Sequence, residues 1–180
     1  MEAYLGLIGV VIGATLPFLF RVVERYLQIA GKLCINVKFV ASKDTEEYPE
    51  VINCDGLVMN LPMWVEFTNS RGIAEIVRNL NIYAYYNARR VAEFVQIQKS
   101  NKYVYGNREL YSFVVPEKSV TKYDLMYMLR KEECEGEEID ELRIGYYDEN
   151  NKFHEKKILN IKKHVWNIGK IEIKKGWITI

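Results

Sequence analysis

Hydrophobic and polar positions divide the chain into two parts. Residues 3–20 carry no charge, and their apolar side chains would cover every side of a helix rather than one stripe. After Gly31 the pattern becomes alternating, and within residues 33–40 every second side chain is apolar, as in a strand with one buried face. The pattern predicts an N-terminal helical unit, residues 1–31, followed by a β domain, residues 32–180.

The uncharged stretch has the length of a membrane anchor. Its 18 residues, folded as a helix, make a slightly short crossing of a bilayer core. A signal peptide is a second interpretation, but it needs a basic start and a small-residue cleavage site, whereas this stretch follows Glu2 and ends in Phe20. A helix buried in protein or covered by a partner is the third. We favour the anchor and expect a transmembrane helix in contact with membrane lipid.

The flanking charges predict an orientation for this anchor. Arg21, Arg25 and Lys32 follow the stretch, and we expect them at the membrane surface. Basic residues on that side predict a single-pass protein of the inner (cytoplasmic) membrane with its C-terminal domain in the cytoplasm. The three cysteines, with no Cys-x-x-Cys pair, agree with a reducing compartment.

Small residues in the same stretch indicate helix association. Gly6, Gly9 and Gly13 lie near one helical face, where missing side chains let two backbones approach closely. Glycine is also simply frequent in membrane helices, so both interpretations stay open. Helical spacing continues over residues 21–30 until Gly31 offers a C-cap, which predicts a short helical stalk.

The rest of the chain predicts strands. Pro62 falls inside one of them, a position better suited to an edge strand or a bulge. Asp148 to Asn151 is the clearest hairpin turn. Many short strands without a second helix favour an all-β sandwich or barrel of about 8–10 strands. The expected strands are residues 33–40, 58–68, 80–86, 91–97, 109–115, 123–129, 142–147, 153–161, 170–174 and 177–180.

Three runs within this region carry a resemblance. Residues 64–70, 76–86 and 115–120 resemble the immunoglobulin-like β-sandwich domains of small uncharacterised prokaryotic membrane-anchored proteins. The chain lacks the Cys, Trp, Cys spacing of an antibody-type domain. The resemblance implies an immunoglobulin-like sandwich and, by fold analogy, a binding or scaffolding role rather than a particular activity.

Composition and motifs argue against catalysis. Lys and Arg total 25 against 24 Asp and Glu, so no global field attracts nucleic acid. Nucleotide-binding and hydrolase motifs are absent from the sequence. No catalytic set of an acid, a base and a nucleophile can be assembled from its residues. His154 and His164 lie among lysines without ligand spacing around them. We therefore expect no enzyme activity, no metal, no cofactor and no small-molecule substrate.

Charge and aromatic clusters offer further candidate surfaces. An acidic block, residues 124–149, precedes a basic block, residues 150–180, and the two could pair across a hairpin as exposed ion pairs. Alternatively, the acidic cluster forms a mobile loop that binds a basic protein partner. Its members are Glu132, Glu133, Glu135, Glu137 and Glu138.

Tyrosines with arginines nearby could stack on single-stranded nucleic acid. We favour ordinary cross-strand packing instead, so a nucleic-acid partner is not expected. The residues concerned are Tyr83, Tyr85, Tyr86, Tyr103, Tyr105 and Tyr111, with Arg89, Arg90 and Arg108.

Together the observations predict a membrane-anchored, non-enzymatic binding or sensing module that acts through protein–protein interaction, with a protein partner or as a homo-oligomer. The alternative is a membrane-perturbing effector of the defence or toxin type. In that interpretation the N-terminal helices cluster in the bilayer under control of the β domain.

Overall fold

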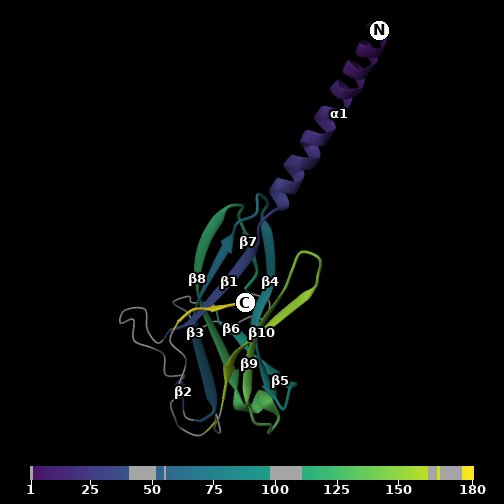
Figure 1. Ribbon diagram of the computed structural model, residues 1–180. Helices are drawn as coiled ribbons and strands as arrows, with labels where there is room; N and C mark the ends of the chain where they lie inside the picture. The colour runs from purple at the N-terminus through teal and green to yellow at the C-terminus, as the bar shows by residue number, and fades with distance from the viewer. Residues whose placement is uncertain (1, 41–51, 55, 98–110, 162–165, 167–175) are drawn as a thin grey trace.

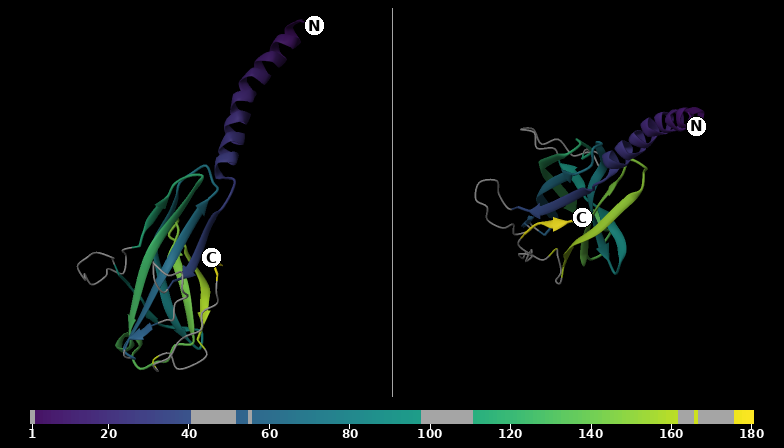
Figure 2. Two further views of the ribbon diagram at one scale, coloured as in Figure 1. Left: turned by 90° about the vertical axis from the view of Figure 1, so that its left-hand side faces the viewer. Right: turned by 45° about the horizontal axis from the view of Figure 1, so that its top comes forward.

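One long helix projects from the end of a domain made of two antiparallel sheets (Figure 1). The computed structural model describes residues 2–40, 52–54, 56–97, 111–161, 166 and 176–180, with the backbone alone for 2–11 and 52–54. The helix, α1, spans Glu2–Ile29 and leads through Gly31 directly into the first strand. In both views of Figure 2 it extends away from the sheets.

The first sheet has a central strand that is paired along both sides. Its order is β11 (Ile178–Thr179), β1 (Leu33–Phe39), β3 (Val58–Asn69), β8 (Ser119–Arg130) and β6 (Val95–Ile97), and β2 (Ile52–Cys54) also pairs with β3.

The second sheet is built around β4. Its order is β10 (Phe153–Asn160), β9 (Glu141–Tyr147), β4 (Glu75–Tyr86) and β5 (Arg89–Glu93), and β7 (Phe113–Val115) pairs with the first residues of β4. A short 3-10 helix, η1 (Lys131–Cys134), follows β8.

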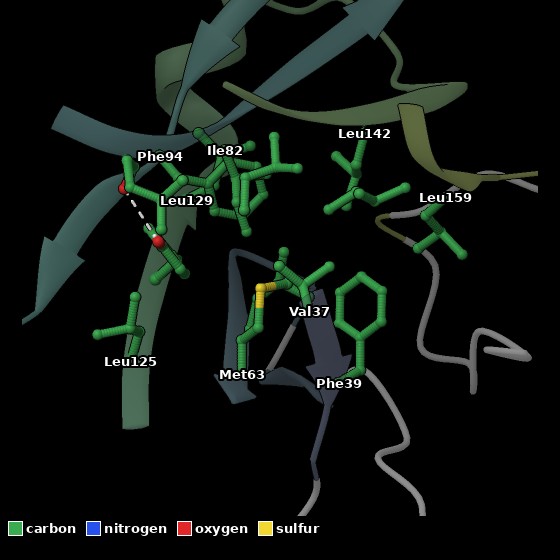
Figure 3. Packing of buried hydrophobic residues seen from close by; sticks show 14 of the residues in the cluster. Val37, Phe39, Met63, Ile82, Phe94, Leu125, Leu129, Leu142 and Leu159 are labelled. Carbon is green, nitrogen blue, oxygen red and sulfur yellow. Dashed lines mark hydrogen bonds between the residues drawn. The ribbon is translucent and has the colours of Figure 1, made fainter. Parts of the chain in front are cut away.

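The core lies between the two sheets. Buried and half-buried residues alternate along the whole of β3, as the period of two in its sequence predicts. Figure 3 shows Val37 and Met63 of the first sheet meeting Ile82 and Leu142 of the second, and all four are fully buried. Such burial stabilises the fold by about 1.5–3 kcal/mol for each large apolar side chain.

Pro62 lies in the central strand rather than at an edge or a bulge. β1 pairs with β3 only from Met63 onward and β2 only up to Asn60, so Pro62 falls in the gap between them. The Val40 amide donates to the Pro62 carbonyl, at 3.1 Å, on this same side. Because the N–H and the carbonyl of a strand residue point the same way, the missing N–H faces the gap and breaks no ladder bond.

The strand predictions fail where the chain changes sheet. The expected strand 91–97 is two strands, because the chain leaves β5 in the second sheet at Phe94 and enters β6 in the first. β4 starts at Glu75 rather than at residue 80 and contains an irregularity between Arg78 and Asn81. The expected strand 170–174 lies outside the described residues.

Buried amides replace the ladder bonds that these irregularities remove. Gln96 donates to the Asn79 side chain at 2.7 Å and to the Leu80 carbonyl at 3.2 Å. Asn81 donates to the Phe94 carbonyl at 2.8 Å. Each amide is fully buried and hydrogen-bonded, as buried polar groups in proteins must be.

The predicted transmembrane helix is wrong. In the part of the chain that the structure describes, no helix is both long and apolar enough to cross a membrane. Between residues 12 and 29, α1 carries Arg21, Glu24 and Arg25, which interrupt its apolar positions. The single-pass, inner-membrane assignment rests on that span and is corrected accordingly.

A two-residue turn joins β4 to β5, which confirms the hairpin expected between residues 80 and 97. Asn87 and Ala88 have φ angles of 50° and 62°, the left-handed region that both central positions of a type I′ turn require. Alanine pays about 1–2 kcal/mol for that conformation, whereas glycine adopts it freely.

Ala88→Gly removes the cost of the left-handed conformation, but glycine also gains conformational entropy in the unfolded state, which opposes this gain. The net effect should be a rise of about 0.5–1 kcal/mol in the free energy of unfolding. Urea denaturation measures the change. Ala92→Gly is the matched control: Ala92 is buried in β5 and outside the left-handed region, so this variant should lose stability. Equal effects of the two substitutions would contradict the turn geometry.

Candidate interaction surface

Helix α1 exposes a large apolar surface. Ten large apolar side chains on it are each between 43% and 69% exposed. A contiguous apolar surface of this kind marks an interaction site, whereas scattered exposed apolar residues are ordinary. The ten residues are Ile12, Leu16, Phe18, Leu19, Phe20, Val22, Val23, Tyr26, Leu27 and Ile29.

The polar residues of the same helix share one side. At 3.6 residues per turn, Arg21, Glu24, Arg25 and Gln28 fall on one strip along the last three turns. Glu24 and Gln28 also border a shallow hollow between the helix and the turns at Gly72 and Lys118. Leu27 lines the same hollow, so the helix meets the domain at the border between its polar strip and its apolar side, and both are exposed along residues 12–29.

The last turn of α1 is fixed to the domain. The Gly72 amide donates to the Gln28 carbonyl at 2.7 Å. A Cβ added at Gly72 would lie 3.2 Å from the Gln28 backbone, so glycine permits the close approach. The Ser70 hydroxyl accepts from the Lys32 amide at 2.8 Å and donates to the Lys32 carbonyl at 3.0 Å. The helix base is thus held by hydrogen bonds from Gly72 and Ser70.

Asn69 fixes the turn that receives the helix. Its buried side-chain amide donates to the carbonyls of Ile73, at 2.8 Å, and Pro116, at 3.0 Å, while its oxygen accepts from the Arg71 amide at 2.9 Å. Arg71 in turn pairs with the buried Glu75 at 2.5 Å and donates to the Gly31 carbonyl at 3.3 Å. One buried amide therefore connects the β3–β4 turn, the β7–β8 turn and the helix base.

The glycines predicted to associate helices lie within α1. A Cβ added at Gly13 would have no atom within 4 Å, so the surface there is open. Gly6 and Gly9 belong to the part of α1 whose backbone alone is described. Helix association through the three glycines stays a prediction.

The predicted membrane-surface residues lie at the domain end of the helix. Arg21 and Arg25 are exposed on the polar strip, and the Lys32 backbone is bound to Ser70. Their expected role depends on the span that the structure does not support.

The predicted acidic loop forms η1 and a following turn. Glu132 pairs with Arg130 at 3.3 Å, and Glu137 pairs with Arg89 of β5. Glu135 caps η1 with a φ of 52°. Glu133 has a buried carboxylate oxygen without a hydrogen-bond partner among the described residues, and Glu138 interacts within the chain. Partner binding through this acidic cluster stays a prediction.

The acidic and basic blocks pair across the β9–β10 hairpin. Lys157 of β10 contacts Glu141 of β9, and Arg143 of β9 lies 3.2 Å from Glu155 of β10. Lysine and arginine together lower the pKa of the Glu141 carboxyl, against the raising effect of its burial. The Lys157–Glu141 pair joins the basic block to the acidic block, as the ion-pair interpretation expects. The Arg143–Glu155 pair joins the minority charges of the two blocks, and both glutamates are largely buried rather than exposed.

Arginines cover the tyrosines of the second sheet. The Arg90 guanidinium lies 3.9 Å from the centre of the Tyr83 ring, and that of Arg143 lies 4.0 Å from the centre of the Tyr85 ring. Burial raises the pKa of Tyr83. These rings pack within the sheet, as the cross-strand interpretation expects, and Tyr103 and Tyr105 lie outside the described residues.

Glu155 is the hub of this cluster. Its carboxylate accepts from the Tyr85 hydroxyl at 2.7 Å, from Arg143 at 3.2 Å and from Arg90 at 3.4 Å. Sequence reasoning missed it because its three partners come from β4, β5 and β9, and only the strand register brings them together.

Cys134 is buried in the core, and His154 contacts residues of its own hairpin. Burial, with help from Glu133 and Glu138, raises the pKa of the Cys134 thiol to about 11, so it stays protonated at neutral pH. The His154 ring stacks on Tyr146 and lies 2.7 Å from the Asp148 carboxylate. Among the described residues no group of three or more metal-binding side chains occurs.

Glu155→Ala should lower the free energy of unfolding by about 2–3 kcal/mol, because two arginines and a tyrosine lose a shared, largely buried acceptor. Urea denaturation measures this. Glu149→Ala, in the exposed turn of the same hairpin, should change stability by less than about 0.5 kcal/mol. A loss at Glu155 no larger than at Glu149 would show that the cluster is not coupled.

The hydrogen bond from His154, together with the amides of Lys152 and Asn150, lowers the pKa of Asp148 below its usual 3.8. The folded state therefore favours the charged carboxylate. Its contribution to stability is present above pH 3.8 and disappears as the pH falls through the lower folded-state pKa. The stability difference between the unsubstituted protein and Asp148→Asn should accordingly shrink in acid. A difference that is constant with pH would contradict the pairing.

Comparison with known proteins leaves the chain without a family. No protein-family model and no curated protein matches it. A solved structure described as a protein from Archaeoglobus fulgidus is similar at 12% identity, covering 72% of this chain and 96% of that one, with a TM-score of 0.36. A score of that size assigns neither fold nor function, and the resemblance to immunoglobulin-like domains stays a prediction.

Proposed function

We propose that this protein is a non-enzymatic interaction module that binds protein through α1, with the two-sheet domain as the rigid base of the helix. The observation that supports the proposal is the set of ten large apolar side chains on α1, each at least 43% exposed. They lie on a helix that is fixed to the domain through its last turn.

The stability of the helix itself supports a partner. In proteins most of the stability of a helix comes from packing its apolar face rather than from intrinsic propensity. In the described chain the apolar side of α1 from Leu19 to Ile29 stays exposed. A protein surface that covers it would supply the missing packing, at about 25 cal/mol for each Å² of apolar area removed from water.

Site-specific photocrosslinking tests this proposal in the cells that produce the protein. A photoreactive phenylalanine analogue at Val23, on the apolar side, should form adducts with protein. The same analogue at Glu24, the adjacent position on the polar strip, is the matched control and should form several-fold fewer. Equal yields at the two positions, or adducts at Val23 with lipid alone, would overturn the proposal.

A further inference from the structure

We propose that the protein bound by α1 is the same helix of further copies of this chain, and that three or more copies form a helical bundle. This inference rests on the proposed function of α1 as a protein-binding element and names its partner. It is carried by the arrangement of apolar and charged positions along the helix.

A continuous seam runs along the exposed side of α1. Ile12, Leu16, Leu19, Val23 and Tyr26 recur at alternate spacings of four and three residues, the a and d positions of a heptad. All five are between 43% and 69% exposed. A seam of this period packs against a second helix that has the same period.

The seam is too wide for a two-stranded coil. Phe20 and Leu27 flank it on one side and Val22 and Ile29 on the other, each at least 50% exposed. In a two-stranded coil those flanking positions lie at the edge of the interface and are usually charged. Here the apolar face covers about half of the helix circumference, the width that a helix in a bundle presents to its core. Three or more helices are needed to cover it.

The charges point to copies of the same chain as the neighbours. Arg21, Glu24 and Arg25 lie opposite the seam, so a bundle leaves them in water. In coiled coils, charged residues at the positions that flank the seam commonly select a different helix as partner. From Leu19 to Ile29 the flanking positions of this seam carry no charged residue. An apolar face without charges packs against an identical face without burying a charge, and most soluble oligomers are homo-oligomers with closed symmetry.

The available area is sufficient for a stable assembly. Phe20 and Tyr26 are 68% and 69% exposed, so together they offer roughly 200–350 Å² of the area that aromatic side chains bury. The seven aliphatic side chains, each about half exposed, bring the helix to the order of the roughly 800 Å² per partner of a stable interface.

Light scattering of the purified full-length protein tests the inference. We expect a mass of three or more copies. Val23→Lys places a charge in the seam and should weaken assembly at least about tenfold. Glu24→Lys places the same side chain on the polar strip and should leave the mass unchanged. Circular dichroism of both variants checks that the β domain, from which Val23 is remote, stays folded.

A monomeric or dimeric mass would overturn the inference, as would a mass that Val23→Lys does not change. Identification of the Val23 photoadduct separates the two proposals. An adduct with a second copy supports both. An adduct with a different polypeptide overturns the self-assembly inference and leaves α1 as a protein-binding element. The absence of a protein adduct overturns both.

Discussion

Burial of the inward row of β3 is the constraint on which the rest of the structure depends. Its alternate side chains are essentially inaccessible to water, and the strand pairs with β1 and β2 on one side and β8 on the other. A strand that is buried on one face and hydrogen-bonded along both edges fixes the register of its neighbours. That register determines where β3 ends, at Asn69, and so where the buried amide can receive the base of α1.

The sequence predicts the fold wherever local pattern and tertiary environment agree. β3 alternates cleanly, and β3 and β9 lie within one residue of their expected bounds, whereas β8 begins at Ser119, before the expected start at residue 123. The break between β5 and β6 at Phe94 is not predicted by the sequence. Residues 91–97 have the pattern of one continuous strand, and the break exists only because the chain passes from one sheet to the other at that point. The start of β4 was missed because Asn79, with a φ of 47°, breaks the period.

The candidate surface was predictable in part, for physical reasons. Composition alone identifies the apolar N-terminal stretch, and the glycines indicate association. A bilayer and a bundle of helices both take apolar side chains, however, so hydrophobicity alone does not separate them. The distinction comes from Arg21, Glu24 and Arg25, which share one side of a helix that is exposed from residue 12 onward. The role of Glu155 depends on strand register and has no local signature.

The outer strands of the second sheet carry charges that oppose uncontrolled polymerisation of the chain. Among the described residues β10 and β5 end the order of that sheet, and exposed strand edges invite chains to add to one another without limit. β10 carries Lys156 and Lys157, and β5 begins with Arg89 and Arg90. Charged edges resist strand addition. In the proposed assembly such edges leave the helix as the surface for contacts between copies, which favours a closed particle over an open fibre.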